Sequence, residues 1–78
     1  MQLTVISPER QILSCEVSSV ELPGAKGRFE ILPGHYALLS SLVDGVLRYN
    51  DGGAEDKFLP VSGGFVEVKD DTVTVCVG

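Results

Sequence analysis

Apolar and polar residues alternate with a period of two over most of the chain, in short runs separated by glycine, proline and aspartate. The clearest run covers residues 64–77, where valines take every second position on either side of Asp70-Asp71. A period of two points alternate side chains to opposite faces of a strand, so this run predicts a two-stranded hairpin with one buried face. No window shows the 3.6-residue period of an amphipathic helix. The pattern therefore predicts an all-β domain.

Further strands are predicted by the same alternation and by the turn residues between them. Pro23-Gly24 fits the central positions of a type II turn, Pro33-Gly34 predicts a second turn, and Asp44-Gly45 predicts a two-residue hairpin. Residues 15–22 change phase, which indicates a bulge or burial on both faces. We expect a small flattened β-sandwich or barrel of about eight to ten short strands, in a single domain that spans residues 1–78. The other predicted strands are 2–6, 11–13, 27–32, 36–42, 46–50 and 57–61.

The phase of the alternation also selects a core. A chain of 78 residues is small, yet 44% of them are hydrophobic and the mean hydropathy is +0.22 despite a net charge of −5. Some apolar surface is therefore expected to remain for a partner. Gly63-Gly64 opens a strand and indicates a bulge or a close approach of two backbones. The residues expected to be buried are Val5, Phe29, Ile31, Leu47, Val66, Val68, Val73 and Val75.

Charge and hydropathy exclude several classes of partner. The six basic residues are scattered, whereas nucleic-acid binding needs clustered lysine and arginine, so no nucleic-acid partner is expected. No apolar stretch approaches the roughly 18 residues of a membrane span, so we expect no direct membrane insertion. Residues 1–5 read as a strand, and no signal peptide is expected. Cys15 and Cys76 are expected to be two reduced thiols, because they are too few and too distant for a disulfide scaffold.

No motif indicates catalysis. Gly24-Ala25-Lys26-Gly27 contains glycine and lysine but leads into a strand, whereas a phosphate loop leads into a helix. One histidine and two remote cysteines cannot complete a metal site. Carboxylate pairs such as Asp70-Asp71 lie at turns, where solvated charge is the ordinary explanation. We expect no catalytic, cofactor-binding or metal-binding residue, no cofactor, and no enzymatic activity.

Three segments stand out along the chain: Leu22–His35 with its two Leu-Pro-Gly turns, Gly45–Tyr49 with its Gly-x-Leu-Arg pattern, and Ser62–Val68 with its glycine pair. In this order they resemble the N-terminal β-domain of the epsilon subunit of F-type ATP synthases. The family commonly continues its Pro-Gly-His turn with Ala-Pro-Leu-Leu, whereas this chain reads Tyr36-Ala37-Leu38-Leu39. The resemblance covers nearly the whole chain and implies a β-sandwich.

The resemblance also implies a function and a set of contact residues. It implies a non-catalytic central-stalk subunit that links gamma to the membrane rotor ring and couples proton flow to ATP synthesis. The implied place is peripheral, on the cytoplasmic face of a bacterial inner membrane, with a chain that is monomeric in isolation. A lone histidine beside Pro-Gly is by itself more often a capping or solvent-facing residue. By resemblance, the partner-binding candidates become Arg28, Pro33, Gly34, His35 and Tyr36. Because the Pro33-Gly34 turn reverses the chain, we expect Arg28, His35 and Tyr36 to lie together at one end of the sandwich.

Two further expectations accompany this reading. Typical epsilon subunits continue into an Ala-rich helical hairpin, whereas this sequence ends at Gly78, so we expect a short form without ATP binding. The alternative function is a biotinyl or lipoyl carrier domain, since those are also small acidic all-β modules. Glu55-Asp56-Lys57 weakly resembles the sequence around their modified lysine, but Lys57 is expected to begin a strand and not to lie at the tip of a turn.

Overall fold

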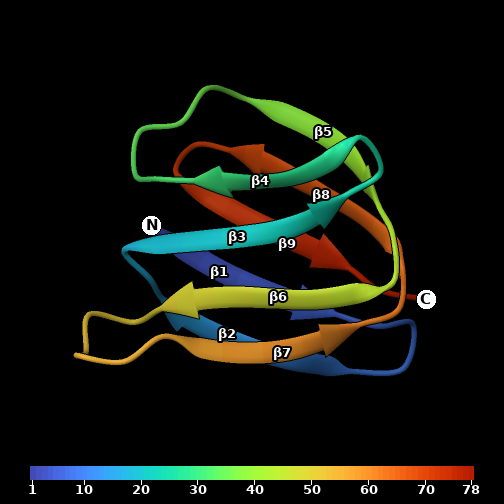
Figure 1. Ribbon diagram of the computed structural model, residues 1–78, viewed down its shortest axis with the longest axis horizontal. Helices are drawn as coiled ribbons and strands as arrows, with labels where there is room; N and C mark the ends of the chain where they lie inside the picture. Colours follow the sequence, from blue (N-terminus) through green and yellow to red (C-terminus); the bar gives the residue numbers. More distant parts are fainter.

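The computed structural model describes residues 1–78 and consists of nine strands with no helix (Figure 1). The predicted all-β class and strand number are confirmed. The strands are β1 (Gln2–Ile6), β2 (Gln11–Glu16), β3 (Ser19–Gly24), β4 (Gly27–Ile31), β5 (Leu38–Leu42), β6 (Gly45–Asn50), β7 (Lys57–Val61), β8 (Gly64–Lys69) and β9 (Thr72–Cys76).

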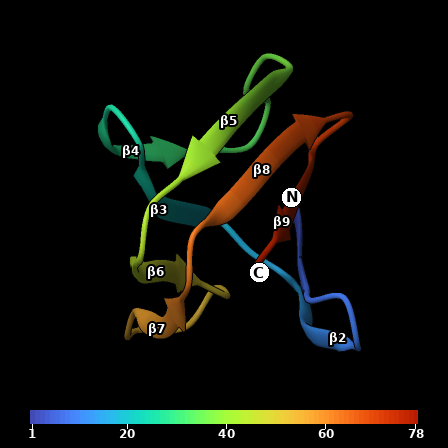
Figure 2. The ribbon, with the colours of Figure 1, turned by 90° about the vertical axis from the view of Figure 1, so that its right-hand side faces the viewer.

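One continuous sheet curls into two layers around the core. The first layer has the order β2-β1-β9-β8-β5, and the second consists of β4, β3, β6 and β7. All neighbouring strands are antiparallel except β1 and β9, which are parallel. Figure 2 shows the two layers from one end, with β3, β6 and β7 on one side and β8, β9 and β2 on the other. Strand pairing passes between the layers only at Gly24 and Leu42, where β3 meets β5.

This corner replaces the turn that was predicted at Pro23-Gly24. β3 continues through Gly24, which pairs with Gly27, and the turn falls at Ala25-Lys26. On the other side of β3, the Pro23 carbonyl accepts a hydrogen bond from the Val43 amide at 2.9 Å. A Cβ on Gly24 would lie 2.6 Å from the Gly27 carbonyl oxygen and 2.7 Å from the Phe29 ring, closer than real Cβ contacts allow. The prediction was wrong because local turn preference yielded to tertiary pairing.

Two other local predictions were wrong for the same kind of reason. Asp44-Gly45 does not close a hairpin, because β3 lies between β5 and β6 and the chain crosses the corner instead of folding back. The phase change in residues 15–22 is a strand break and not a bulge. At the break, the Val17 amide donates to the Met1 carbonyl at 2.7 Å and the Ser18 amide donates to the Asn50 carbonyl at 2.8 Å. The chain passes there from the first layer to the second.

The predicted β8–β9 hairpin is confirmed. Asp70 and Asp71 occupy its two turn positions with φ of 51° and 57°, the left-handed values that a type I′ turn requires. The close backbone approach predicted at Gly63-Gly64 is also confirmed, since a Cβ on Gly64 would overlap the carbonyl oxygen of Cys76. The β6–β7 hairpin around residues 51–56 has the predicted place as well.

The core lies between the layers and contains no buried polar or charged side chain. All the residues expected to be buried are buried except Phe29, which is half-buried and packs against the cluster from the edge strand β4. Val77, which continues the valine alternation, is also half-buried. The buried cluster consists of Met1, Leu3, Val5, Val17, Val20, Leu22, Ile31, Leu42, Leu47, Val61, Val66, Val68, Val73 and Val75.

The two cysteines are free and half-buried, as expected for reduced thiols. Cys15 pairs with Leu3 across β1 and β2 and packs against the core. Burial raises the pKa of the Cys15 thiol, and the negative charge of Asp51 raises it further. Both effects disfavour the thiolate, which is the reactive form.

Leucine-to-alanine changes on the two sides of the sheet test the assigned core. Leu47→Ala removes a fully buried side chain and is expected to lower the free energy of unfolding by about 2–5 kcal/mol. Leu39→Ala removes the same atoms from a side chain that is 69% exposed, and a change within about 0.5 kcal/mol is expected. Urea unfolding followed by fluorescence or circular dichroism measures both. Equal effects would contradict the assigned faces.

Alkylation kinetics test the environment of Cys15. In a Cys76→Ser variant, the iodoacetamide rate is expected to rise with pH around a midpoint above that of a short peptide spanning residues 11–20. The midpoint is expected to be higher in the folded chain because burial and Asp51 both hold the thiol in its protonated, unreactive form. A midpoint equal to or below that of the peptide would show that the thiol is not desolvated.

Candidate partner-binding loop

The segment of residues 32–37 joins β4 in the second layer to β5 in the first layer, and we call it the loop. Pro33 and Gly34 occupy the centre of a β-turn, closed by a hydrogen bond from the His35 amide to the Leu32 carbonyl at 3.1 Å. Gly34 has φ of 82°, the conformation that a type II turn requires at its second central residue. The turn predicted from Pro33-Gly34 is therefore confirmed. In Figure 1 the loop lies at the left-hand end of the molecule, near the N-terminus.

Asp71 fixes the loop from a distant part of the sequence. Its Oδ1 accepts a hydrogen bond from the Gly34 amide at 3.0 Å, and its backbone carbonyl accepts one from the Gln2 amide at 3.1 Å. Its Oδ2 lies 3.6 Å from the ammonium group of Met1. Sequence reasoning placed Asp71 among solvated turn carboxylates and missed this role. No local signal could reveal it, because 37 positions separate the two partners.

His35 and Tyr36 form a stacked pair on the loop. Their ring centroids are 4.2 Å apart with an interplanar angle of 27°. The Nδ1 of His35 lies 2.8 Å from the Tyr36 carbonyl oxygen. The Tyr36 side chain is 74% exposed and Leu32 is 51% exposed, although both are large and apolar. Exposed tyrosine and leucine on a well-defined loop are suited to an interface with another protein.

Arg28 does not join the other candidate residues. It follows Gly27 at the start of β4, beside the β3–β4 turn, whereas the loop begins after Ile31 at the other end of that strand. Three residues of extended chain amount to about 10 Å. The expectation that Arg28 sits with His35 and Tyr36 was therefore wrong, and Arg28 instead forms an ion pair through Nε with Glu21 at 2.7 Å. The contact of Arg28 with a partner stays a prediction.

Glu21 also belongs to an ion-pair network on the outer face of the second layer. Arg48 lies at its centre, with a side chain that is only 19% exposed. Its guanidinium lies 2.8 Å from Glu30, 3.5 Å from Asp56 and 3.9 Å from Glu21. In the strand register, Glu21 on β3 lies opposite Glu30 on β4 and opposite Arg48 on β6, so the register brings these charges together. The sequence alone does not show this network, because β6 pairs with β3 only through tertiary structure.

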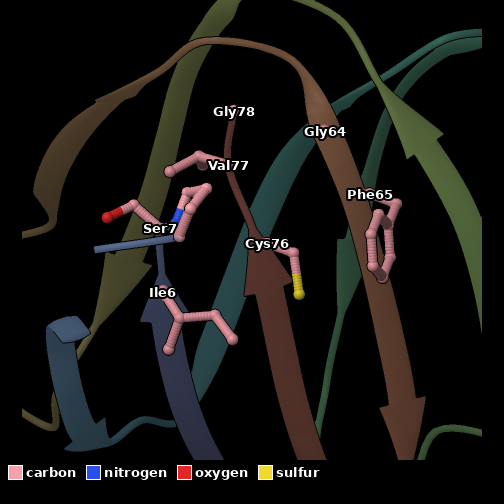
Figure 3. Close-up of a pocket in the computed structure, with 8 residues that line it drawn as sticks. Ile6, Ser7, Gly64, Phe65, Cys76, Val77 and Gly78 are labelled. Atoms are coloured by element: carbon pink, nitrogen blue, oxygen red, sulfur yellow. The ribbon is translucent and has the colours of Figure 1, made fainter. Parts of the chain in front are cut away.

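An apolar hollow lies on the outer face of the first layer (Figure 3). It has a volume of about 330 Å³, and Ile6, Cys76 and Phe65 line it from the three neighbouring strands β1, β9 and β8. Phe65 on β8 is exposed, and so is Leu39 on the adjacent strand β5. A sequence signal for this surface existed, since Phe65 has the opposite parity to the core residue Val66. The lining offers no pair of nucleophile and base.

The remaining charged and metal-ligating side chains do not gather into a site. No group of three or more histidine, cysteine, aspartate or glutamate side chains is arranged to hold a metal ion. Lys57 begins β7, and its ammonium lies 2.6 Å from Asp51, a contact that lowers the pKa of Asp51 and raises that of Lys57. A carrier domain needs its lysine at a hairpin tip, so this geometry does not favour the carrier alternative. The structure contains no helix long and apolar enough to cross a membrane.

Comparison with known families gives one match that covers all the residues. Residues 1–78 match the family model described as "ATP synthase, Delta/Epsilon chain, beta-sandwich domain". The curated ATP synthase epsilon chain of Desulfitobacterium hafniense is 48% identical over 73 residues, which are 94% of this chain and 54% of the relative. That of Desulfosudis oleivorans is 40% identical over 77 residues, 99% of this chain and 58% of the relative. The chain thus spans a little over half the length of these curated relatives.

Solved structures show the same architecture. A chain in the cryo-EM structure of the Euglena gracilis mitochondrial ATP synthase, OSCP/F1/c-ring in rotational state 1, aligns with a TM-score of 0.88 at 27% identity. The alignment covers 96% of this chain and 48% of that chain. A chain in the Tetrahymena thermophila mitochondrial ATP synthase central stalk/c-ring structure aligns with a TM-score of 0.82 over 97% of this chain and 61% of that chain. At 21% identity, the second likeness supports the fold alone.

Proposed function

Because the chain belongs to the family of the ATP synthase delta/epsilon chain beta-sandwich domain, we propose that it acts in a non-catalytic central-stalk subunit of an F-type ATP synthase. It links the gamma subunit to the membrane rotor ring, turns with them, and so couples proton flow to ATP synthesis. The observation that carries the proposal is the family match over residues 1–78 together with 48% identity to an epsilon chain. The neighbour from a structure that contains F1 and the c-ring supports the same assembly.

The proposed contact site is the loop, with Pro33, Gly34, His35 and Tyr36 as the contact residues. Support comes from its exposed apolar side chains and from its bracing, since the Gly34 amide is held by Asp71 and the turn is closed by His35 and Leu32. A subunit that transmits torque needs a contact surface that is already ordered before binding. A surface of this kind loses little conformational entropy when it binds.

The proposal includes a place in the cell. The curated relatives named above are epsilon chains of bacteria, which supports a peripheral location on the cytoplasmic face of the bacterial inner membrane, held there through gamma and the rotor ring. The domain is taken to be a monomer when isolated and to carry no catalytic step of its own.

Acidic residues on the loop test this function. In the double variant His35→Glu and Tyr36→Glu, two negative charges enter the proposed interface, where they must be desolvated or repelled. The isolated domain is expected to keep its melting temperature within a few degrees, because the loop lies outside the strands and tolerates change. Proton-coupled ATP synthesis by enzyme reconstituted with the variant is expected to fall by about tenfold or more, in line with a loss of a few kcal/mol in binding.

The matched control adds the same charge elsewhere. Gln11→Glu and Ala54→Glu change two exposed residues outside the loop, and the reconstituted enzyme is expected to keep its activity. Loss of melting temperature and activity together in the loop variant would mean that the loop is only structural. Full activity in both double variants would mean that another face binds the rotor.

A further inference from the structure

We propose that His35 recognises its partner as a hydrogen-bond acceptor through Nε2, in the neutral tautomer that carries its proton on Nδ1. The inference rests on the proposed function, in which the loop is the contact site, and it specifies the chemistry of that contact. The partner group is then an N–H or O–H donor of a protein chain and not a carboxylate or carbonyl oxygen.

The tautomer follows from one contact. The Nδ1 of His35 lies 2.8 Å from the carbonyl oxygen of Tyr36. A carbonyl oxygen can only accept, so Nδ1 must carry the proton and donate it. In a neutral imidazole the other nitrogen is then an unprotonated acceptor. Nε2 makes no hydrogen bond to any other residue of the chain, so its lone pair is left for an outside donor.

The orientation of the ring is also fixed within the chain. The stacking of Tyr36 holds one face of the imidazole, and the His35 amide is tied to the Leu32 carbonyl. Asp71 holds the preceding residue through the Gly34 amide. These contacts hold the backbone up to His35, and the contact of Nδ1 with the Tyr36 carbonyl sets the direction in which the ring presents Nε2. Prearranged polar groups of this kind give specificity, because a partner with the wrong donor pattern leaves them unpaired.

Nuclear magnetic resonance tests the tautomer directly on the isolated chain. His35 is the only histidine of the chain, so every imidazole signal belongs to it. A two-bond ¹H–¹⁵N spectrum of the ¹⁵N-labelled chain in mildly alkaline buffer distinguishes the protonated from the unprotonated ring nitrogen. We expect Nδ1 to be the protonated nitrogen in the folded chain and Nε2 in the urea-unfolded chain, where no carbonyl is held beside the ring. Protonation of Nε2 in the folded chain would overturn the proposal.

Two amide substitutions test the acceptor in the assembly. The amide of His35→Gln reaches the position of Nε2, whereas that of His35→Asn reaches only the position of Nδ1. With ATP synthase depleted of its epsilon chain as the probe, His35→Gln is expected to bind within about threefold of the unaltered chain. His35→Asn is expected to bind about threefold to tenfold more weakly than His35→Gln, as the loss of one hydrogen bond predicts.

The outcomes separate this inference from the proposed function. Equal binding by His35→Gln and His35→Asn, with weakened binding by the double variant His35→Glu and Tyr36→Glu, would overturn the acceptor role and leave the loop as the contact site. Unchanged binding by all three variants would overturn the contact site itself, and with it this inference.

Discussion

The constraint on which the rest of the structure depends is the corner where β3 meets β5. It is the only place where strand pairing passes between the two layers, through Gly24 and Leu42. Backbone and ring atoms fill the space that a side chain on Gly24 would occupy, so only glycine fits there without a shift. With the corner in place, β3 pairs with β6 along its first half and with β5 at its end. The core then closes between two layers that one continuous sheet supplies.

The loop owes its position to this closure. It leaves β4 in one layer and enters β5 in the other, so its two ends are set by the distance between the layers. The β8–β9 turn lies at the same end, and there Asp71 connects the loop to the beginning of β1 through hydrogen bonds to Gly34 and Gln2. The loop is therefore braced against strands of the first layer. This bracing supports the proposed role of the domain in transmitting rotation.

Local patterns in the sequence correctly predicted the features that depend on neighbouring residues. The alternation of Val66, Val68, Val73 and Val75 gave their burial correctly, and the Pro33-Gly34 turn followed from the need for positive φ at its second position. The failures occurred where distant segments meet. Pro23-Gly24 carries a turn signal but forms part of a strand, because pairing with Gly27 and Leu42 outweighs that preference.

The candidate site shows the same division. His35 and Tyr36 became contact candidates because the Pro-Gly-His turn resembles that of the epsilon family, and their contact with a partner stays a prediction. Arg28 was placed with them wrongly, since the strand that separates it from the loop puts it at the opposite end of β4. Asp71 was missed because its contact with Gly34 depends on the packing of the β8–β9 turn against the loop. Charge and turn propensity can be predicted from neighbouring residues. A hydrogen bond between residues 37 positions apart can be identified only once the fold is known.

The most direct test of the account is amide hydrogen exchange of the chain, measured free and after assembly with ATP synthase depleted of its epsilon chain. The account predicts that exchange slows on assembly in peptides covering the loop and the β8–β9 turn beside it. It predicts little change in peptides from the β6–β7 hairpin around residues 51–56, which serves as the internal reference. Protection confined to that hairpin or to the ion-pair network around Arg48, with the loop unchanged, would contradict the central claim that the loop is the surface by which this domain binds the rotor.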